Sequence, residues 1–140
     1  MELSDALDFL RRTHHGILIT IKGDGRPQSS NIAYAVRDDD TIVISVTDGR
    51  AKTANLRRRP QASLHVNRDD FWAYAVVEAD VELGPVAAAP DDDTVDRLVE
   101  YYRAVAGEHD DWDRYRRAMV DDRRLVLTLH PTHAYGMLGR

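Results

Sequence analysis

The residues best suited to do chemistry lie in a basic segment, residues 48–60, with the sequence DGRAKTANLRRRP. Its Asp-Gly opening and its terminal proline predict a short helix. Cations stabilise the C-terminal end of a helix, yet Arg50 and Lys52 fall in or just before the first turn, beside free backbone N–H groups. Because a helix N-terminus attracts anions, we expect Arg50, Lys52 and the Thr53 hydroxyl to bind a phosphate. The alternative is a basic helix whose charges simply face water.

A second polar segment, residues 25–31 with the sequence GRPQSSN, falls where a strand is expected. The period-2 geometry of a strand places Gln28 and Ser30 on one face and Ser29 and Asn31 on the other. Side-chain amides and hydroxyls on a strand can hydrogen-bond the edge of a heterocyclic ring. The segment therefore predicts contacts to a ring, and the competing interpretation is a solvent-exposed edge of a sheet.

The histidines and acidic runs form no recognisable metal site or catalytic motif. His130 and His133 are expected on opposite faces of a strand, and the adjacent His14 and His15 also point apart. The patterns HExxH, GxSxG and GxGxxG do not occur. Helix capping explains the aspartates at 91–93 better than calcium binding does. We therefore expect no metal.

Composition limits the class of protein. The chain has 140 residues, a formal net charge of −5 and no cysteine. Its length suits one domain spanning residues 1–140. The negative charge argues against non-specific binding to nucleic acid, and no apolar run is long enough to span a membrane. Without cysteine, disulfides, thiolate nucleophiles and zinc–thiolate sites are excluded, and with no signal-peptide pattern we expect a cytoplasmic protein.

The hydrophobic pattern predicts the elements that position these residues. Alternating apolar residues and turn signals indicate strands, and helical spacing indicates helices. The strands are expected at 16–21, 27–36, 41–46, 61–67, 71–83 and 123–135, and the helices at 4–12, 48–60, 91–106 and 110–120. Short turns between the first three strands predict an antiparallel meander.

The strand at 71–83 has the clearest alternation. Its odd-numbered positions, from Ala73 to Leu83, are small or apolar, and its other face begins aromatic at Trp72 and Tyr74 and ends acidic. Such a continuous apolar face is typical of a closed barrel or of sheet packing. We expect a mainly β (α+β) fold, a six-stranded antiparallel barrel with peripheral helices.

Several ordered motifs resemble the pyridoxamine 5'-phosphate-oxidase-like split β-barrel family. The GRPQ and SN of residues 25–31, the RAKT and NLR of residues 50–57 and the WAYAV of residues 72–76 carry the resemblance. It continues through AAAPDDDTV at 87–95, residues 107–120 and the terminal HAYG at 133–136, and so covers nearly the whole chain. The match is to the branch that binds the deazaflavin coenzyme F420 rather than to the FMN oxidases.

The resemblance implies a homodimer of split barrels with cofactor in clefts between the subunits. The Arg50 and Lys52 segment then binds the cofactor phosphate, and the strand from Gln28 to Asn31 lies against the ring. Trp72 and Tyr74 border the cleft from the partner subunit, or else they only pack in the dimer. The implied cofactor-binding residues are Gln28, Ser30, Asn31, Arg50, Lys52, Thr53, Asn55, Trp72 and Tyr74.

The expected function is that of an F420-dependent oxidoreductase, which transfers a hydride between coenzyme F420 and a small organic acceptor. F420 carries a phosphodiester and an oligoglutamate tail, and the cations at 50, 52 and 57–59 suit so anionic a molecule. No side chain is identified as an obligatory acid or base. The alternatives are an FMN-dependent oxidase or reductase on the same fold, a non-catalytic F420 carrier, and a dimeric interaction domain with an empty cleft.

Overall fold

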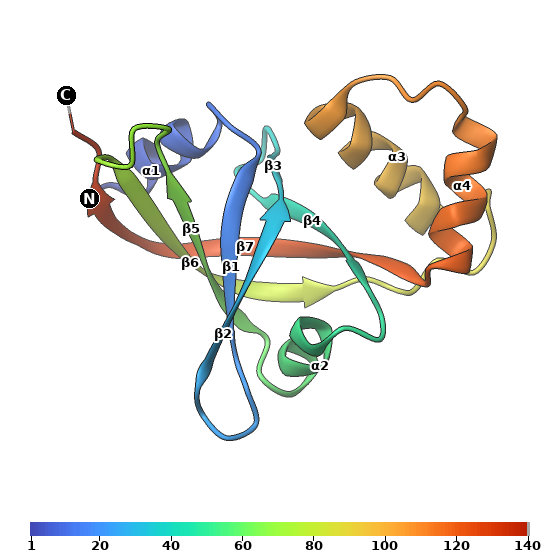
Figure 1. Cartoon of the computed structure of the whole chain (residues 1–140), viewed down its shortest axis with the longest axis horizontal. Helices are drawn as coiled ribbons and strands as arrows, with labels where there is room; N and C mark the ends of the chain where they lie inside the picture. The colour runs from blue at the N-terminus through green and yellow to red at the C-terminus, as the bar shows by residue number, and fades with distance from the viewer. Residues whose placement is uncertain (140) are drawn as a thin grey trace.

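The alternating strands form one curved antiparallel sheet in the computed structural model, which describes residues 1–139 (Figure 1). The strands are β1 (His15–Ile21), β2 (Pro27–Ala33), β3 (Ala35–Val36), β4 (Ile42–Thr47), β5 (Gln61–Asn67), β6 (Tyr74–Leu83) and β7 (Arg124–Met137). The helices are α1 (Leu3–Leu10), α2 (Ala51–Arg58), α3 (Asp93–Ala106) and α4 (Trp112–Asp121). The expected antiparallel split barrel with peripheral helices is confirmed, with one strand more than the six predicted.

The extra strand arises because the predicted strand at 27–36 is interrupted at Tyr34. The sheet order is β2-β1-β5-β6-β7-β4-β3, so β2 and β3 stand at opposite ends of the sheet although they follow each other in the chain. The predicted meander is therefore wrong: β2 pairs with β1, whereas β3 pairs with β4 at the far end. The chain crosses from one edge to the other at residue 34, and β2 and β4 come into contact as the sheet curls.

Tyr34 lies at the crossing, and its side chain is fully buried. Its hydroxyl donates to the Leu10 carbonyl at 2.8 Å, and its backbone N–H donates to the His14 carbonyl at 2.8 Å. These bonds tie the bend to the end of α1. Burial raises the pKa of the Tyr34 hydroxyl, which therefore stays a protonated donor.

The predicted face of the long strand β6 is confirmed. Ala75, Val77, Ala79 and Val81 are buried in the core of the barrel, while Glu78 and the other acidic residues of the second face are exposed. Because side chains alternate along a strand, the periodicity identified the inward face. A second apolar cluster lies outside the barrel, where α3 and α4 cover Val43 of β4 and Val126 of β7.

A β-bulge in β7 corrects the prediction for two histidines. His130 pairs with Asp80 and His133 pairs with Glu78, so the two histidines share the outer face with these two acids. The extra residue between them, Thr132, reverses the parity that simple alternation predicts. Across residues 1–139, no group of three or more His, Asp or Glu side chains could hold a metal ion. No helix in the same range is long and apolar enough to cross a membrane.

Candidate functional site

A cleft of about 340 Å³ brings the two predicted motifs together. It lies where β2, the end of β4, the start of α2 and the start of β7 meet. Its lining residues are Gln28, Ser30, Val46, Thr47, Arg50, Ala51, Lys52 and Arg124. The polar strand and the basic helix thus face the same space. The last strand, which was predicted but not assigned to the site, contributes Arg124.

Three cations line this cleft without an acidic partner. Arg50, Lys52 and Arg124 form no ion pair with a carboxylate in the described part of the chain. The pKa of Lys52 is lowered, first by its burial and then by repulsion from Arg50 and Arg124. Like charges held this close are stabilised when an anion joins them, so the cleft suits a phosphate or carboxylate group.

Arg124 adds an independent sign of a missing partner. Its Nε atom is buried and has no hydrogen-bond partner, and its Nη1 reaches Ser45 Oγ only at 3.5 Å. A buried donor that stays unpaired costs about 1–3 kcal/mol unless a ligand satisfies it. The residue opposite Arg124 on β4 is Thr47, where the chain enters α2. The sequence did carry a signal for the orientation of Arg124. The leucines at 125, 127 and 129 define the core face of the strand, so position 124 lies on the opposite face.

Asn55 lies behind the cleft and orients Gln28. Its Nδ2 donates to Gln28 Oε1 at 2.7 Å and to Thr20 Oγ1 at 3.1 Å, and its Oδ1 accepts a bond from Arg58 Nη2 at 2.7 Å. Its side chain is only 5% exposed. With its carbonyl oxygen held by Asn55, Gln28 has its amide N–H₂ group left to donate to a ligand. Asn55 is therefore a positioning residue in this geometry.

Thr53 also lies beneath the cleft. Its hydroxyl is fully buried and donates to the Thr47 carbonyl at 2.8 Å, which fixes the turn from β4 into α2. The first backbone bond of this helix runs from the Ala54 N–H to the Arg50 carbonyl. The N–H groups of residues 51–53 precede it and are the donors that a helix N-terminus offers to an anion.

The remaining cations of the basic segment point elsewhere. Arg57 forms an ion pair with Asp48 at 2.5 Å, and Arg123 holds the same carboxylate at 3.1 Å. These two guanidiniums hold the pKa of Asp48 below its usual value. Arg58 is engaged with Asn55, and Arg59 is exposed. Of the five cations expected to attract an anionic tail, Arg50 and Lys52 line the cleft.

A second compartment of about 330 Å³ adjoins the cleft. It shares Lys52 and Arg124 with the cleft and is otherwise lined by Asn31, Ile32, Ala33, Ser45, Tyr101, Tyr102, Tyr115 and Met119. The Tyr101 hydroxyl donates to the Ala33 carbonyl at 2.8 Å, and the Tyr115 hydroxyl donates to the Leu98 carbonyl at 2.9 Å. The tyrosines therefore present ring surface to the compartment, which suits a flat apolar group beside the cations.

Trp72 and Tyr74 lie apart from both compartments. Trp72 is 75% exposed and contacts Phe71, and the Tyr74 ring lies 5.2 Å from the His65 ring. Neither residue lines the cleft or the second compartment of its own chain. Within one chain, the structure thus brings together Gln28, Ser30, Arg50 and Lys52, sets Asn31 beside them, and places Thr53 and Asn55 underneath.

Comparison with known proteins adds a family and a fold. The family model described as pyridoxamine 5'-phosphate oxidase matches residues 4–138. A conserved hypothetical protein from Mycobacterium tuberculosis is 22% identical with a TM-score of 0.72, over 98% of this chain and 84% of that one. An F420 reductase is also 22% identical, with a TM-score of 0.63 over 91% of this chain and 94% of that one. A heme-binding protein from Mycobacterium smegmatis is 19% identical, with a TM-score of 0.68 over 99% of this chain and 55% of that one.

Proposed function

Because this chain belongs to the pyridoxamine 5'-phosphate oxidase family, we propose that it is an oxidoreductase that binds coenzyme F420 in the cleft. The observation that carries the proposal is the cluster of Arg50, Lys52 and Arg124, which has no carboxylate partner among residues 1–139 and includes a buried, unpaired Nε. When bound, the coenzyme supplies hydride transfer at its ring C5, to or from a small organic acceptor.

The residues of the cleft fit the two chemical parts of this coenzyme. Lys52 and Arg124 stand at the junction of the two compartments, where charge-assisted hydrogen bonds would hold a phosphodiester. Gln28 and Ser30 offer an amide N–H₂ and a hydroxyl to polar edges of a ring. Asn31 borders the tyrosine-lined compartment, where flat apolar surface is available. The chain would bind and orient the reactants, and no side chain is assigned as an acid or base.

A second candidate is an FMN-dependent oxidase or reductase on the same fold. The cation cluster in the cleft is compact, because Arg57 and Arg58 bond to Asp48 and Asn55. A single phosphate monoester is enough to match such a cluster. The similarity to a solved F420 reductase, at 22% identity, supports the deazaflavin instead.

Titration of the purified protein with F420 and with FMN, followed by cofactor fluorescence, tests the choice. We expect F420 to bind more tightly, and binding to weaken as salt screens the exposed part of the contact. Turnover is then assayed with reduced F420 and a panel of quinone, enone, tetrapyrrole and nitroaromatic acceptors. Tighter binding of FMN would contradict the choice of F420 and support the FMN-dependent enzyme instead. Binding of F420 with no turnover of any acceptor would make the protein a carrier.

We also propose that two copies of the chain form a homodimer. Phe71, Trp72, Tyr135 and Met137 are 67%, 75%, 47% and 64% exposed, an unusual amount of large apolar surface near one end of β6 and β7. We propose that the second copy covers this surface and that Trp72 then lies against the cleft of its partner, as the family resemblance implies. Light scattering at micromolar concentration should give the mass of a dimer, and Trp72→Ser should weaken both association and cofactor binding. A monomeric parent protein that binds cofactor normally would contradict this.

A further inference from the structure

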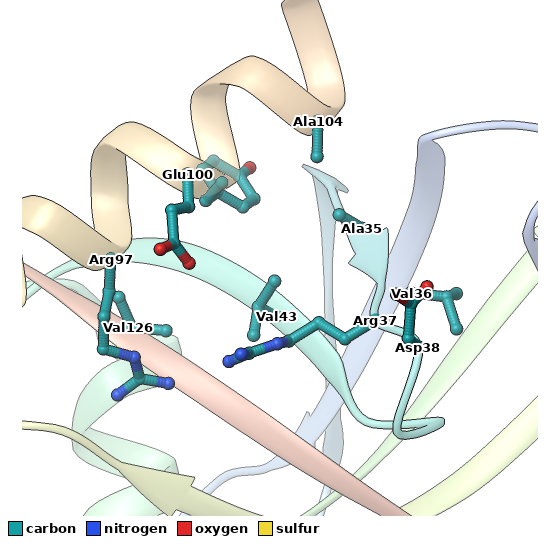
Figure 2. A pocket seen from close by; sticks show the side chains of 10 residues that line it. Ala35, Val36, Arg37, Asp38, Val43, Arg97, Glu100, Ala104 and Val126 are labelled. Atoms are coloured by element: carbon teal, nitrogen blue, oxygen red, sulfur yellow. The ribbon is translucent and has the colours of Figure 1, made fainter.

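A separate cavity of about 240 Å³ lies under α3, against the turn that joins β3 to β4 (Figure 2). Its lining residues are Ala35, Val36, Arg37, Asp38, Val43, Arg97, Glu100, Tyr101, Ala104 and Val126. None of the cations of the cofactor cleft belongs to it, and Tyr101 is the wall that it shares with the second compartment. The cavity is therefore a distinct space in the molecule.

Three charged side chains are directed into this cavity. Arg97 and Glu100 descend from α3, and Arg37 reaches in from the opposite side, while the Asp38 carboxylate lies on the far side of Arg37 from its guanidinium (Figure 2). None of Arg37, Arg97 and Glu100 forms an ion pair within residues 1–139. The lining as a whole is balanced in formal charge, because Asp38 and Glu100 match the two arginines. The side chains that point inward, however, are two guanidiniums and one carboxylate, since the Asp38 carboxylate is turned away (Figure 2).

The surrounding structure holds the side chain of Arg97 and the backbone of Arg37. Arg97 Nη2 donates to Thr128 Oγ1 at 2.9 Å, which leaves its Nε and Nη1 groups available. The Arg37 backbone is fixed in the turn, because its N–H donates to the Thr41 carbonyl at 2.8 Å and its carbonyl accepts a bond from Arg11 Nη2 at 3.0 Å. Anchoring of this kind lowers the entropy lost when a ligand binds.

The floor of the cavity is apolar. Ala35, Val43 and Val126 are 4%, 6% and 2% exposed, and they belong to the apolar cluster under α3 and α4. Ala104 closes one side from the exposed surface of α3. An occupant can thus rest an apolar body on the valines while a charged end reaches the guanidiniums.

We propose that this cavity binds a small monocarboxylate with a branched apolar body. Guanidinium groups form strong charge-assisted hydrogen bonds with a carboxylate, and one negative charge complements the two guanidiniums and one carboxylate that point inward (Figure 2). Glu100 disfavours a dianion by repulsion. The volume of about 240 Å³ is below the roughly 300–1,000 Å³ of pockets for drug-sized ligands, so the occupant is a small metabolite. The proposal does not depend on the identity of the cofactor.

Calorimetric titration with 4-methylpentanoate tests the proposal, beside acetate and 4-methylpentan-1-ol at equal ionic strength. We expect 4-methylpentanoate to bind at least about tenfold more tightly than either partial analogue, because one lacks the apolar body and the other lacks the charge. Arg97→Gln should weaken binding about tenfold or more. Equal affinity for the alcohol, or an unchanged affinity in the Arg97 variant, would overturn the proposal.

Two further variants locate the site independently of charge. Ala104→Leu fills the cavity from an exposed helical position and should abolish binding while the thermal melt is retained. Lys52→Met alters the cofactor cleft and the second compartment but no residue that lines this cavity, so it should leave this binding unchanged. If Lys52→Met loses the carboxylate and Ala104→Leu keeps it, the ligand occupies the cleft and the inference is wrong.

Glu100→Gln tests the chemical class of the ligand. Removal of the competing carboxylate should tighten binding of 4-methylpentanoate, because the positive charge facing the cavity rises. Leucine, which carries an added ammonium group, is the matched probe. Tighter binding of leucine than of 4-methylpentanoate, lost in the Glu100 variant, would show a zwitterion site and refute the monocarboxylate assignment.

Discussion

Replacement of Lys52 by methionine separates a phosphate-binding role from a structural one. Methionine keeps the length of the side chain and its helix propensity but removes the charge. Lys52 is half-buried next to Arg50 and Arg124, and no carboxylate within residues 1–139 pairs with it. We therefore expect the Lys52→Met protein to bind cofactor more weakly and, without cofactor, to be at least as stable as the parent.

The size of the effect follows from one charge-assisted contact. Such a bond contributes about 1.5–3 kcal/mol, which is roughly a tenfold to hundredfold change in affinity. At a cofactor concentration about 100 times the parent Kd, binding stabilises the parent by about 2.7 kcal/mol and the variant by about 0.4–1.4 kcal/mol. For a domain of this size the cofactor should raise the parent Tm by about 9 °C and the variant Tm by about 1–5 °C.

The pH dependence of stability gives a second, independent signature. The pKa of Lys52 is lowered in the folded protein, so below its ordinary pKa the unfolded chain binds more protons than the folded chain. Stability therefore rises with pH as the lysine loses its proton in the folded state, and this rise ends near the ordinary value. The Lys52→Met protein lacks that contribution, which urea unfolding between neutral and alkaline pH would show.

The matched control is Arg12→Met, which removes an exposed cation from the turn just after α1. That helix lies far from α2 (Figure 1). This variant should bind cofactor like the parent. If Lys52→Met also binds like the parent, or binds weakly only because it unfolds, then Lys52 does not hold the phosphate. The placement of the cofactor along Gln28 and Ser30 then loses its anchor.

Other predictions concern the groups that shape the site and the barrel. Asn55→Ala should lower the free energy of unfolding in urea by about 1–3 kcal/mol, because it leaves buried partners unpaired, and should weaken cofactor binding through a freed Gln28. Tyr34→Phe should lower the free energy of unfolding by about 1 kcal/mol at neutral pH, because it removes the hydrogen bond to the Leu10 carbonyl. Because the pKa of Tyr34 is raised in the folded protein, the unfolded chain loses this proton at a lower pH than the folded chain does. The stability that the protonated hydroxyl contributes is therefore complete below the ordinary tyrosine pKa and falls as pH rises above it. The Tyr34→Phe protein should show a weaker loss of stability at alkaline pH. Gly136→Ala should destabilise strongly, because a Cβ there would lie 2.4 Å from the Tyr74 carbonyl oxygen at a φ of +147°, and a melt within about 2 °C of the parent would contradict this.

The local pattern of the sequence was enough to predict most elements and their faces. In β6 the alternation of small and polar residues identified the inward face, because side chains on a strand alternate whatever its neighbours are. The unusual cations at the start of α2 pointed to an anion site by the same kind of local reasoning, since a helix N-terminus is positive wherever it lies. The association of residues 25–31 with that helix came from the family resemblance.

Other features needed the tertiary structure because they depend on long-range register. The crossing at Tyr34 sends β3 to the far edge of the sheet, which no short-range pattern reveals. The bulge at Thr132 places His130 and His133 on one face, since one extra residue reverses the parity of everything after it.

The site itself shows the same division between local and long-range information. Sequence periodicity determined that position 124 faces away from the core, and it determined that Arg50 and Lys52 begin a helix. Only the pairing of β7 with β4 brings Arg124 to Thr47 and so to those two cations. Only packing shows that Thr53 and Asn55 are buried behind the cleft, with Asn55 bonded to Gln28. The residues of a strand determine which way its side chains point. Which strands lie beside it, and so which groups its side chains contact, depends on the free energy of the whole sheet.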